Sequence, residues 1–214
     1  MVSLLDGMEQ PPTVFVVDDD PAMRRSLQWL VMSAGYAVET FDSAVAFKNA
    51  YDSRVHGCLV LDFRMPGMSG LELQEQLSSR HIHIPVIVIS GAADVSTAVR
   101  AMKCGAVDFI EKPFEDRALL ERIAQAISLD GRRRADQARY AEIEERIQRL
   151  TPREREVMKL VIAGKANKQI AAKLGRSEKT IEIHRSRVMK KMEAGSLAEL
   201  VRLVDDHGRH AGAQ

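Results

Sequence analysis

The first part of the chain alternates short apolar runs with patterns typical of helices. The strongest runs are Thr13–Val17, Cys58–Leu61 and Pro85–Ile89, and weaker ones cover Ala37–Phe41 and Val107–Ile110. Runs that are apolar at nearly every position are typical of strands buried on both faces of a parallel sheet. Helices are expected between them, near 22–34, 44–51, 70–79, 95–104 and from 116 onward. Five βα units in succession predict an α/β doubly wound five-stranded parallel sheet, with its ligand site outside the carboxyl ends of the strands.

The last part of the chain is patterned as an all-α domain of four short helices. Thr151–Glu154 combines an N-cap, a proline at the first helical position and a capping box, and Gly164 ends the helix that starts there. The later helices are expected over 167–174, from the cap Ser177 to about Glu193, and after a second capping box at Ser196–Glu199. Because Gly175 provides a tight turn between the second and third helices, the pattern predicts a helix-turn-helix.

The stretch between these two patterns, from Asp116 to Leu150, has few apolar positions and many charges. We interpret it as a long helical linker, either continuous or broken at Gly131. Ile143, Ile147 and Leu150 have helical spacing and could pair with a second copy, but they are too few to predict a coiled coil. The expected boundaries are 12–127 for the first domain, 128–146 for the linker and 147–207 for the second domain.

Charge is divided unevenly between the two parts. Residues 1–130 hold 18 acidic and 11 basic side chains, and residues 131–214 hold 12 acidic and 20 basic ones, which gives net charges of −7 and +8. Such asymmetry suggests that the second part binds a polyanion, most often nucleic acid. The alternative is that the two oppositely charged parts dock on each other.

Composition excludes several classes of protein. With 45% hydrophobic and 29% charged residues, the chain is neither collagenous nor mucin-like nor wholly disordered. Two cysteines cannot form the paired clusters of a zinc or iron–sulfur framework. The sequence has no signal-peptide pattern and no apolar segment near the roughly 18 residues of a membrane span. We therefore expect a cytoplasmic protein without membrane contacts, in which Cys58 and Cys104 are reduced.

Three carboxylates follow strand ends in the first domain. Asp18 and Asp19 come directly after the first strand and Asp62 ends the third, so all three are expected at one edge of the sheet. Like charges packed together are costly unless a cation binds between them, and oxygen ligands suit Mg²⁺. A carboxylate facing such an ion can act as a nucleophile and form an aspartyl phosphate. Ser90 and Lys112, at two further strand ends, add a hydroxyl and a cation for phosphoryl oxygens.

Four segments at these strand ends resemble the receiver domain of two-component response regulators: Val16–Asp20, Leu61–Gly70, Ile89–Ala92 and Phe109–Phe114. The resemblance covers about residues 12–127 and implies a flavodoxin-like receiver fold. It also implies that a sensor histidine kinase transfers phosphate to this domain.

The resemblance assigns roles to the residues at this edge of the sheet. It implies that Asp62 is the phosphoacceptor and that Lys112 and Ser90 assist the transfer. The implied Mg²⁺ ligands are Asp19 and Asp62, with Asp18 assisting and the backbone carbonyl of Arg64 completing the site. Ser90 and Phe109 are the implied switch pair, and the Lys112–Pro113 peptide bond could be cis. A degenerate receiver, held in one state without phosphate, is a minority alternative.

The third helix of the second domain predicts what this domain contacts. One stripe, which should face the core, contains Ile181, His184, Val188 and Met192. The opposite face presents the candidate DNA-binding residues Lys179, Thr180, Glu182, Ile183, Ser186, Arg187 and Lys190. A helix in the major groove uses such a mixture, with an apolar side chain for thymine methyl groups, arginine for guanine edges and lysine for phosphates. Lys191 is expected to contribute a further phosphate contact.

The segments Leu150–Val157, Asn167–Ala171 and Ser177–Arg185 resemble the LuxR-type helix-turn-helix domain, over about residues 147–205. A receiver followed by this domain is the architecture of the NarL/FixJ response regulators, and the chain looks closest to the FixJ-like branch. The resemblance implies a transcription factor that binds double-stranded promoter DNA, forms a homodimer on phosphorylation and works with RNA polymerase. We further expect phosphorylation to release the basic domain from the acidic receiver.

A Mg²⁺-dependent aspartyl-phosphate phosphatase is the alternative from a different class, because it also uses an aspartate nucleophile on an α/β sheet. Such a hydrolase usually has a second aspartate two residues after the nucleophile, whereas Phe63 and Arg64 follow Asp62. It would also leave the basic helix-turn-helix unexplained. We therefore expect a regulator and not an enzyme.

Overall fold

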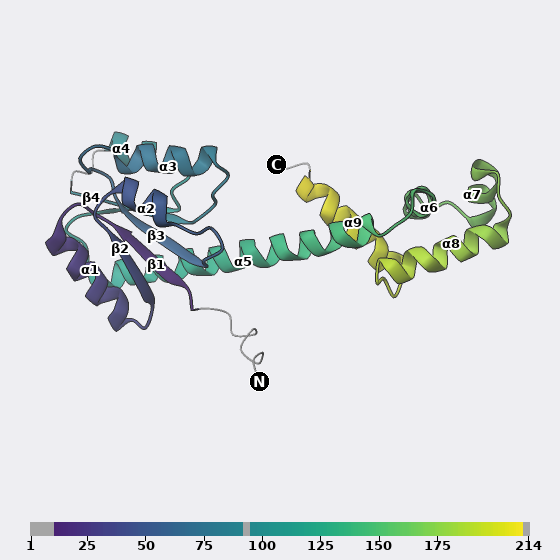
Figure 1. Ribbon diagram of the computed structural model, residues 1–214, viewed down its shortest axis with the longest axis horizontal. Coiled ribbons are helices and arrows are strands. Elements are labelled where there is room, and N and C mark those ends of the chain that lie inside the picture. Colours follow the sequence, from purple (N-terminus) through teal and green to yellow (C-terminus); the bar gives the residue numbers. More distant parts are fainter. Residues whose placement is uncertain (1–10, 92–94, 212–214) are drawn as a thin grey trace. The chain divides into compact units, whose positions relative to one another are not determined.

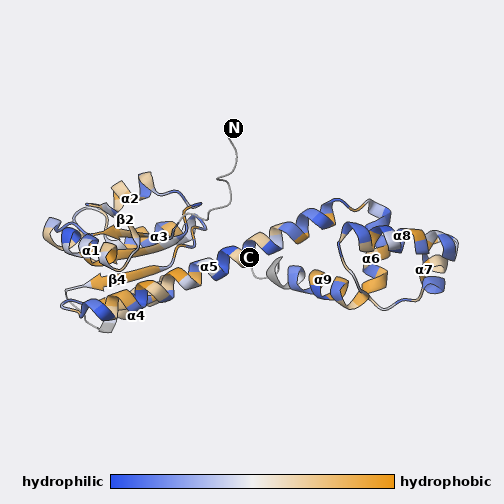
Figure 2. Ribbon diagram, turned by 90° about the horizontal axis from the view of Figure 1, so that it is seen from below, coloured by the Kyte–Doolittle hydropathy of each residue, from blue (hydrophilic) through white to orange (hydrophobic). Residues whose placement is uncertain are grey.

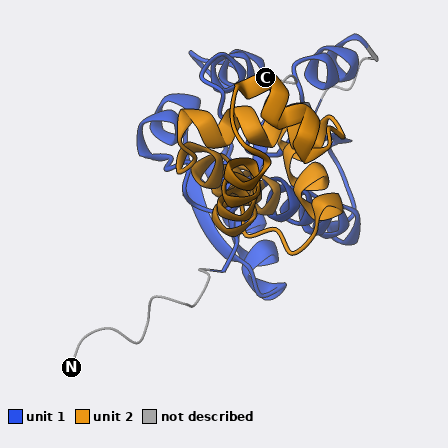
Figure 3. Ribbon diagram, turned by 90° about the vertical axis from the view of Figure 1, so that its right-hand side faces the viewer, with its two compact units in different colours: residues 1–133 blue, residues 134–214 orange. Residues whose placement is uncertain are grey.

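A computed structural model describes residues 11–91 and 95–211 of the chain. The chain divides into two compact units, residues 1–133 and 134–214, which Figure 3 colours separately. None of the helices within the described ranges is long and apolar enough to cross a membrane.

The described part of the first unit is built on a five-stranded parallel sheet in the order β2-β1-β3-β4-β5 (Figure 1). Its strands are β1 (Thr13–Val17), β2 (Ala37–Phe41), β3 (Gly57–Asp62), β4 (Val86–Ser90) and β5 (Asp108–Glu111). The three strongest apolar runs form the central strands, and every residue of β1, β3 and β4 is buried. The weaker runs form the two outer strands, which are only partly buried. The predicted doubly wound fold is confirmed.

Helices cover both faces of this sheet. They are α1 (Pro21–Ser33), α2 (Ala44–Ala50), α3 (Gly70–Ser79), α4 (Val95–Lys103) and the first part of α5 (Asp116–Gln148). Alternate residues of each strand face opposite sides. Phe15 and Leu61 pack with Leu73 of α3, whereas Val60 packs with Leu119 of α5. Figure 2 shows β4 in the hydrophobic colour, as burial on both faces requires of a central strand.

Strand register places the acidic residues together. Val17, the last residue of β1, pairs with Leu61 of β3. Each strand then continues with an aspartate, Asp18 and Asp62, so the two carboxylates lie side by side at the carboxyl edge of the sheet. This is the edge at which doubly wound folds bind ligands.

The described part of the second unit contains four helices besides the end of α5: α6 (Pro152–Ile162), α7 (Asn167–Leu174), α8 (Glu178–Lys191) and α9 (Leu197–Ala211). The capping box of Thr151 with Glu154 and the N-cap Ser177 form as predicted. Gly175, with φ of 62°, takes the left-handed conformation that makes the turn between α7 and α8. The box predicted at Ser196–Glu199 is only half formed, because the Glu199 carboxylate accepts a hydrogen bond from the amide of Gly195.

Helix α5 runs without a break through Gly131, so the continuous alternative describes the linker. The structure nevertheless differs from a separate linker over 128–146. Ile143 is 1% exposed and belongs to the same core as Leu150 and Val157. The guanidinium of Arg146 also donates a hydrogen bond to the carbonyl of Met192. The last part of α5 therefore belongs to the second unit. One buried side chain and several polar contacts hold it there, and the few apolar positions of the sequence did not reveal them.

Candidate functional site

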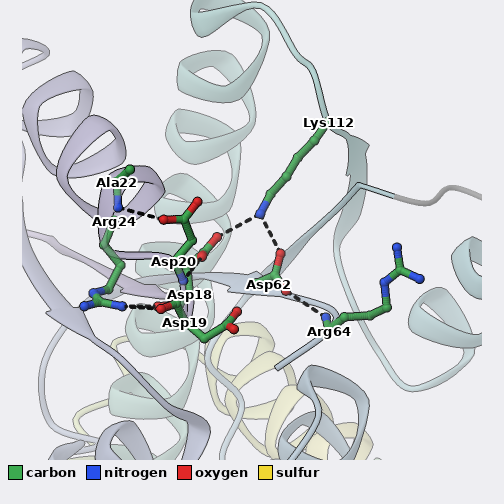
Figure 4. Close-up of polar contacts among 8 residues, drawn as sticks. All are labelled: Asp18, Asp19, Asp20, Ala22, Arg24, Asp62, Arg64 and Lys112. Carbon is green, nitrogen blue, oxygen red and sulfur yellow. Dashed lines mark hydrogen bonds and ion pairs between the residues drawn. The ribbon is translucent and has the colours of Figure 1, made fainter. Parts of the chain in front are cut away.

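The ammonium of Lys112 holds two buried carboxylates together at the carboxyl edge of the sheet (Figure 4). Its Nζ atom lies 2.8 Å from Oδ2 of Asp18 and 2.6 Å from Oδ1 of Asp62. Asp18 is 1% exposed and Asp62 is 6% exposed, so water screens neither charge well. The Lys112–Pro113 peptide bond that follows β5 is cis.

The loop after β1 is fixed by hydrogen bonds from several directions. The amide of Asp20 donates to Oδ1 of Asp18 at 2.9 Å, and Oδ1 of Asp20 caps α1 by accepting from the amide of Ala22. The guanidinium of Arg24 donates to the carbonyls of Asp18 and Asp19 at 2.7 and 3.0 Å. Sequence reasoning missed Arg24; its signal was an arginine in the first turn of a helix that begins immediately after the acidic residues.

Asp19 is arranged differently from its two neighbours. Its side chain is exposed and accepts no hydrogen bond from the residues that the structure describes. With Arg64 and Arg100 it lines a surface pocket of about 620 Å³, completed by Phe63, Met65, Pro66, Ser69 and Leu71. Arg100 comes from α4, and nothing in its spacing along the sequence marked it as a neighbour of the acidic residues.

Burial and neighbouring charges shift the proton affinities at this edge. Burial raises the pKa of Asp62 above its ordinary value of 3.8, and nearby Asp18 raises it further, although the hydrogen bond from Lys112 acts in the opposite direction. Burial alone would lower the pKa of Lys112, but the hydrogen bonds to Asp18 and Asp62 outweigh burial and raise it. Lys112 therefore stays charged, and the ionised form of Asp62 is disfavoured relative to water.

The remaining predicted residues of the first unit lie nearby but are not all in contact. Ser90 is 1% exposed at the end of β4, and its carbonyl accepts a hydrogen bond from the amide of Lys112 at 2.8 Å. Phe109 is partly buried and packs against the core on the α2–α4 side of the sheet. The amide of Arg64 donates to Oδ2 of Asp62 at 2.8 Å. The motif residue Ala92 lies outside the described residues.

The described residues include no group of three or more acidic, histidine or cysteine side chains close enough to hold a metal ion. Asp18 and Asp62 share the cation Lys112 instead, and Asp19 stands beside them. The donor chemistry still fits a hard cation, because the carboxylate oxygens of Asp19 are exposed beside the pocket and hard cations prefer oxygen ligands.

The described face of α8 that was predicted to bind DNA is largely exposed. Ile181, Val188 and Met192 are buried, as predicted, and Nδ1 of His184 is buried without a hydrogen-bond partner in the described structure. Ile183 is 47% exposed, so its apolar side chain is accessible on this face. Exposed polar residues surround it: Lys179, Glu182, Ser186, Arg187 and Lys190. Thr180 is half-buried, and its amide and hydroxyl both contact the cap Ser177.

The predicted phosphate contact of Lys191 assumed a free ammonium, and the structure shows that this ammonium is not free. Its Nζ lies 2.7 Å from Oε2 of Glu154, which is 2% exposed, and also donates to the carbonyl of Arg149 at 3.0 Å. Lys191 compensates a buried carboxylate, so its ammonium is already engaged inside the domain. Sequence spacing could not reveal this, because Glu154 lies 37 residues away in the chain.

Comparisons with known proteins match both parts of the chain to known domain families. Residues 14–124 match the response regulator receiver domain, and residues 148–204 match the bacterial regulatory proteins of the luxR family. Nodulation protein W of Bradyrhizobium diazoefficiens is 49% identical over 195 residues, covering 91% of this chain and 86% of that protein. The transcriptional regulatory protein FixJ of the same organism is 47% identical over 190 residues, covering 89% of this chain and 93% of that protein.

Solved structures give the same result. The response regulator StyR is 48% identical with a TM-score of 0.85, covering 92% of this chain and 99% of that chain. Full-length FixJ from B. japonicum is 45% identical with a TM-score of 0.57, covering 92% of this chain and 98% of that chain.

The doubly wound sheet with its acidic edge, joined to a basic helix-turn-helix, defines a DNA-binding transcriptional response regulator. The chain belongs to the NarL/FixJ family of response regulators. Members of this family are generally not enzymes, and receiver domains typically bind Mg²⁺ at the acidic phosphorylation site.

The raised pKa of Asp62 predicts how this residue affects stability. Since its folded-state pKa exceeds the ordinary value of 3.8, its ionisation costs stability as pH rises through that interval. Asp62→Asn should therefore raise the melting temperature at pH 7, and the gain should vanish below about pH 4. Thermal unfolding followed by circular dichroism measures this, with the exposed Glu39→Gln as control. A gain that did not depend on pH would contradict the assignment to charge.

Proposed function

We propose that Asp62 is the phosphoacceptor of this chain and that a sensor histidine kinase phosphorylates it to switch promoter binding. The observation that carries the proposal is the position of Lys112 Nζ, 2.6 Å from Asp62 and 2.8 Å from Asp18 at the carboxyl edge of the sheet. A carboxylate oxygen of Asp62 forms the bond to phosphorus as the bond to the kinase histidine breaks. Lys112 is placed to receive the negative charge of the phosphoryl oxygens.

We propose Mg²⁺ as the second cation of this site. Asp19 and Asp62 would ligate it, Asp18 would assist, and the backbone carbonyl of Arg64 would complete the protein ligands. The exposed carboxylate of Asp19, which has no hydrogen-bond donor among the described residues, supports this assignment. When bound, the ion supplies positive charge next to the incoming phosphoryl group.

The switch we propose passes from Asp62 to the surface of α4 and β5. Phosphate would attract the Ser90 hydroxyl, and Phe109, which is partly buried, would turn further inward. The reshaped surface would favour a homodimer. The dimer would bind double-stranded promoter DNA in the cytoplasm and act with RNA polymerase.

The DNA interface we propose is the exposed face of α8. Ile183 would contact thymine methyl groups and Arg187 guanine edges, whereas Lys179 and Lys190 would contact phosphates. The exposed polar residues Glu182 and Ser186, and Thr180 at the start of the helix, complete the interface.

Phosphorylation should be confined to Asp62. With a small phosphodonor and Mg²⁺, the intact mass of the full chain should rise by one phosphoryl group, and Asp62→Asn should abolish the rise. Asp19→Ala should slow the same reaction and weaken Mg²⁺ binding, because it removes an exposed ligand. The exposed Glu39→Gln serves as control. Equal labelling of the Asp62→Asn variant would refute the assignment.

DNA binding should separate into two kinds of contact. Lys179→Ala and Lys190→Ala should weaken binding to all sequences alike and reduce the salt dependence by about one counterion each. Ile183→Ala and Arg187→Ala should change the preferred sequence, by about 1–3 kcal/mol per lost base contact. Lys159→Ala, on α6, is the control. Titrations of a randomised duplex pool at several salt concentrations measure both effects, and identical behaviour of the two groups would contradict the proposed orientation of α8.

The receiver should inhibit the DNA-binding unit until it is phosphorylated. A fragment of residues 134–214 should bind DNA without phosphate and more tightly than the unphosphorylated full chain. It must start before Ile143, because that side chain is buried in the core of the unit. Fluorescence anisotropy compares the two proteins, and sedimentation detects the phosphorylated dimer. A fragment that bound no better than the full chain would leave dimerisation alone to explain the switch.

A further inference from the structure

A buried carboxylate joins α5 to the beginning of the phosphoacceptor strand. Asp130 of α5 is 4% exposed, and its Oδ2 atom lies 2.6 Å from Nδ1 of His56. The same oxygen accepts a hydrogen bond from the amide of Gly57 at 3.0 Å. We call these three residues the α5 anchor. None of them belongs to the acidic edge or to the DNA interface.

The receiver partners of Asp130 are held firmly by the central sheet. The carbonyl of His56 accepts a hydrogen bond from the amide of Thr13 at 2.8 Å. Gly57 lies so close to β1 that a Cβ atom there would fall 1.8 Å from the Thr13 carbonyl oxygen. Burial, and to a lesser extent the charge of Asp130, raises the pKa of the adjacent Cys58 thiol to about 12. The anchor therefore attaches α5 to the first residue of β3 and to the loop residue just before it, which is itself bonded to Thr13 of β1.

The anchor occupies a particular place in the chain. Gly57 and Asp62 are the first and last residues of β3, so the anchor and the proposed phosphoacceptor are at opposite ends of one strand. Asp130 lies three residues before the division between the two compact units. Helix α5 then continues unbroken into the second unit. One helix thus carries the anchor in the first unit and Ile143 in the core of the second.

We propose that the α5 anchor couples phosphorylation to DNA binding, with Asp130 as a positioning residue; this inference rests on the function proposed above. β3 pairs with a strand on each side, so a displacement at its Asp62 end is transmitted along a stiff element. A buried carboxylate cannot lose its partners cheaply. If the start of β3 moves, Asp130 must either move with it or lose its hydrogen bonds to His56 and Gly57. Either change alters the position of α5 where it leaves the receiver.

A purely structural role makes a different prediction from a coupling role. If the anchor only stabilises the receiver, its loss lowers the melting temperature but leaves the response to phosphate unchanged. If it couples the two sites, its loss reduces the ratio of DNA affinities with and without phosphate on Asp62. That ratio is the measure of coupling between two sites.

The experiment uses the full chain and a duplex selected from a random pool by the phosphorylated wild-type protein. DNA affinity is measured with and without a small phosphodonor and Mg²⁺ for the wild type, Asp130→Ala, His56→Ala and the double variant. Asp136→Ala, an exposed aspartate of the same helix, is the matched control. Intact mass measures phosphoryl uptake in each protein.

We expect both single variants to take up phosphate and to lose about fivefold or more of the wild-type affinity ratio. The double variant should lose no more than Asp130→Ala, because the His56 side chain acts in the anchor only through Asp130. The Asp136→Ala ratio should equal that of the wild type.

Several results would overturn the inference. The inference is wrong if both single variants keep the wild-type ratio of DNA affinities with and without phosphate. It is also wrong if the double variant loses the sum of the two single losses of this ratio. If Asp130→Ala alone fails to take up phosphate, His56→Ala decides, because it leaves the Gly57 hydrogen bond in place. Loss of uptake in both would assign the contact to folding and not to coupling. A wild-type ratio of one would contradict the proposed function itself, whereas a responsive wild type with unaffected variants contradicts only the anchor.

Discussion

The contact of one ammonium with two buried carboxylates determines what the receiver can do. Parallel strands in register bring Asp18 and Asp62 together whether or not their charges are compatible. Both side chains are nearly inaccessible to water, so their repulsion is only weakly screened. Lys112 offsets this repulsion from the end of a third strand, with one carboxylate oxygen of each aspartate within 2.8 Å. The edge of the sheet is thus an anion-rich site that is held together by one cation.

This balance bears on the phosphoryl group that we propose for the same edge. The pKa of Asp62 stays raised despite Lys112, which means that one cation does not fully offset burial and the neighbouring charge of Asp18. The proposed Mg²⁺ would add positive charge here, and the exposed oxygens of Asp19, which accept no hydrogen bond within the described structure, could ligate it. A phosphoryl group on Asp62 would add negative charge to this edge, and a second cation would offset part of it.

The DNA-binding unit shows how far sequence reasoning extends and where it stops. Periodicity placed the buried stripe of α8 and exposed Ile183, because both depend only on residues within one helix. It failed for Lys191, whose partner Glu154 belongs to α6, and for Ile143, which packs into a core assembled from other helices. In the receiver, strand ends predicted Asp18, Asp62 and Lys112 together. Local patterns reveal elements and their ends, whereas the pairing of single residues distant in the chain depends on packing.

The stability of α5 is unevenly distributed along its length, and this follows from where its side chains are buried. Leu119 and Ile123 bury the first part in the receiver core, and Ile143 buries the last part in the DNA-binding unit. Between Asp130 and Ile143, no residue of the described helix is buried. A helix gains most of its stability from tertiary packing, and Gly131 costs about 0.5–1 kcal/mol relative to alanine. The middle of α5 is therefore its weakest part, and Asp130 is the last residue before it that is buried in the receiver.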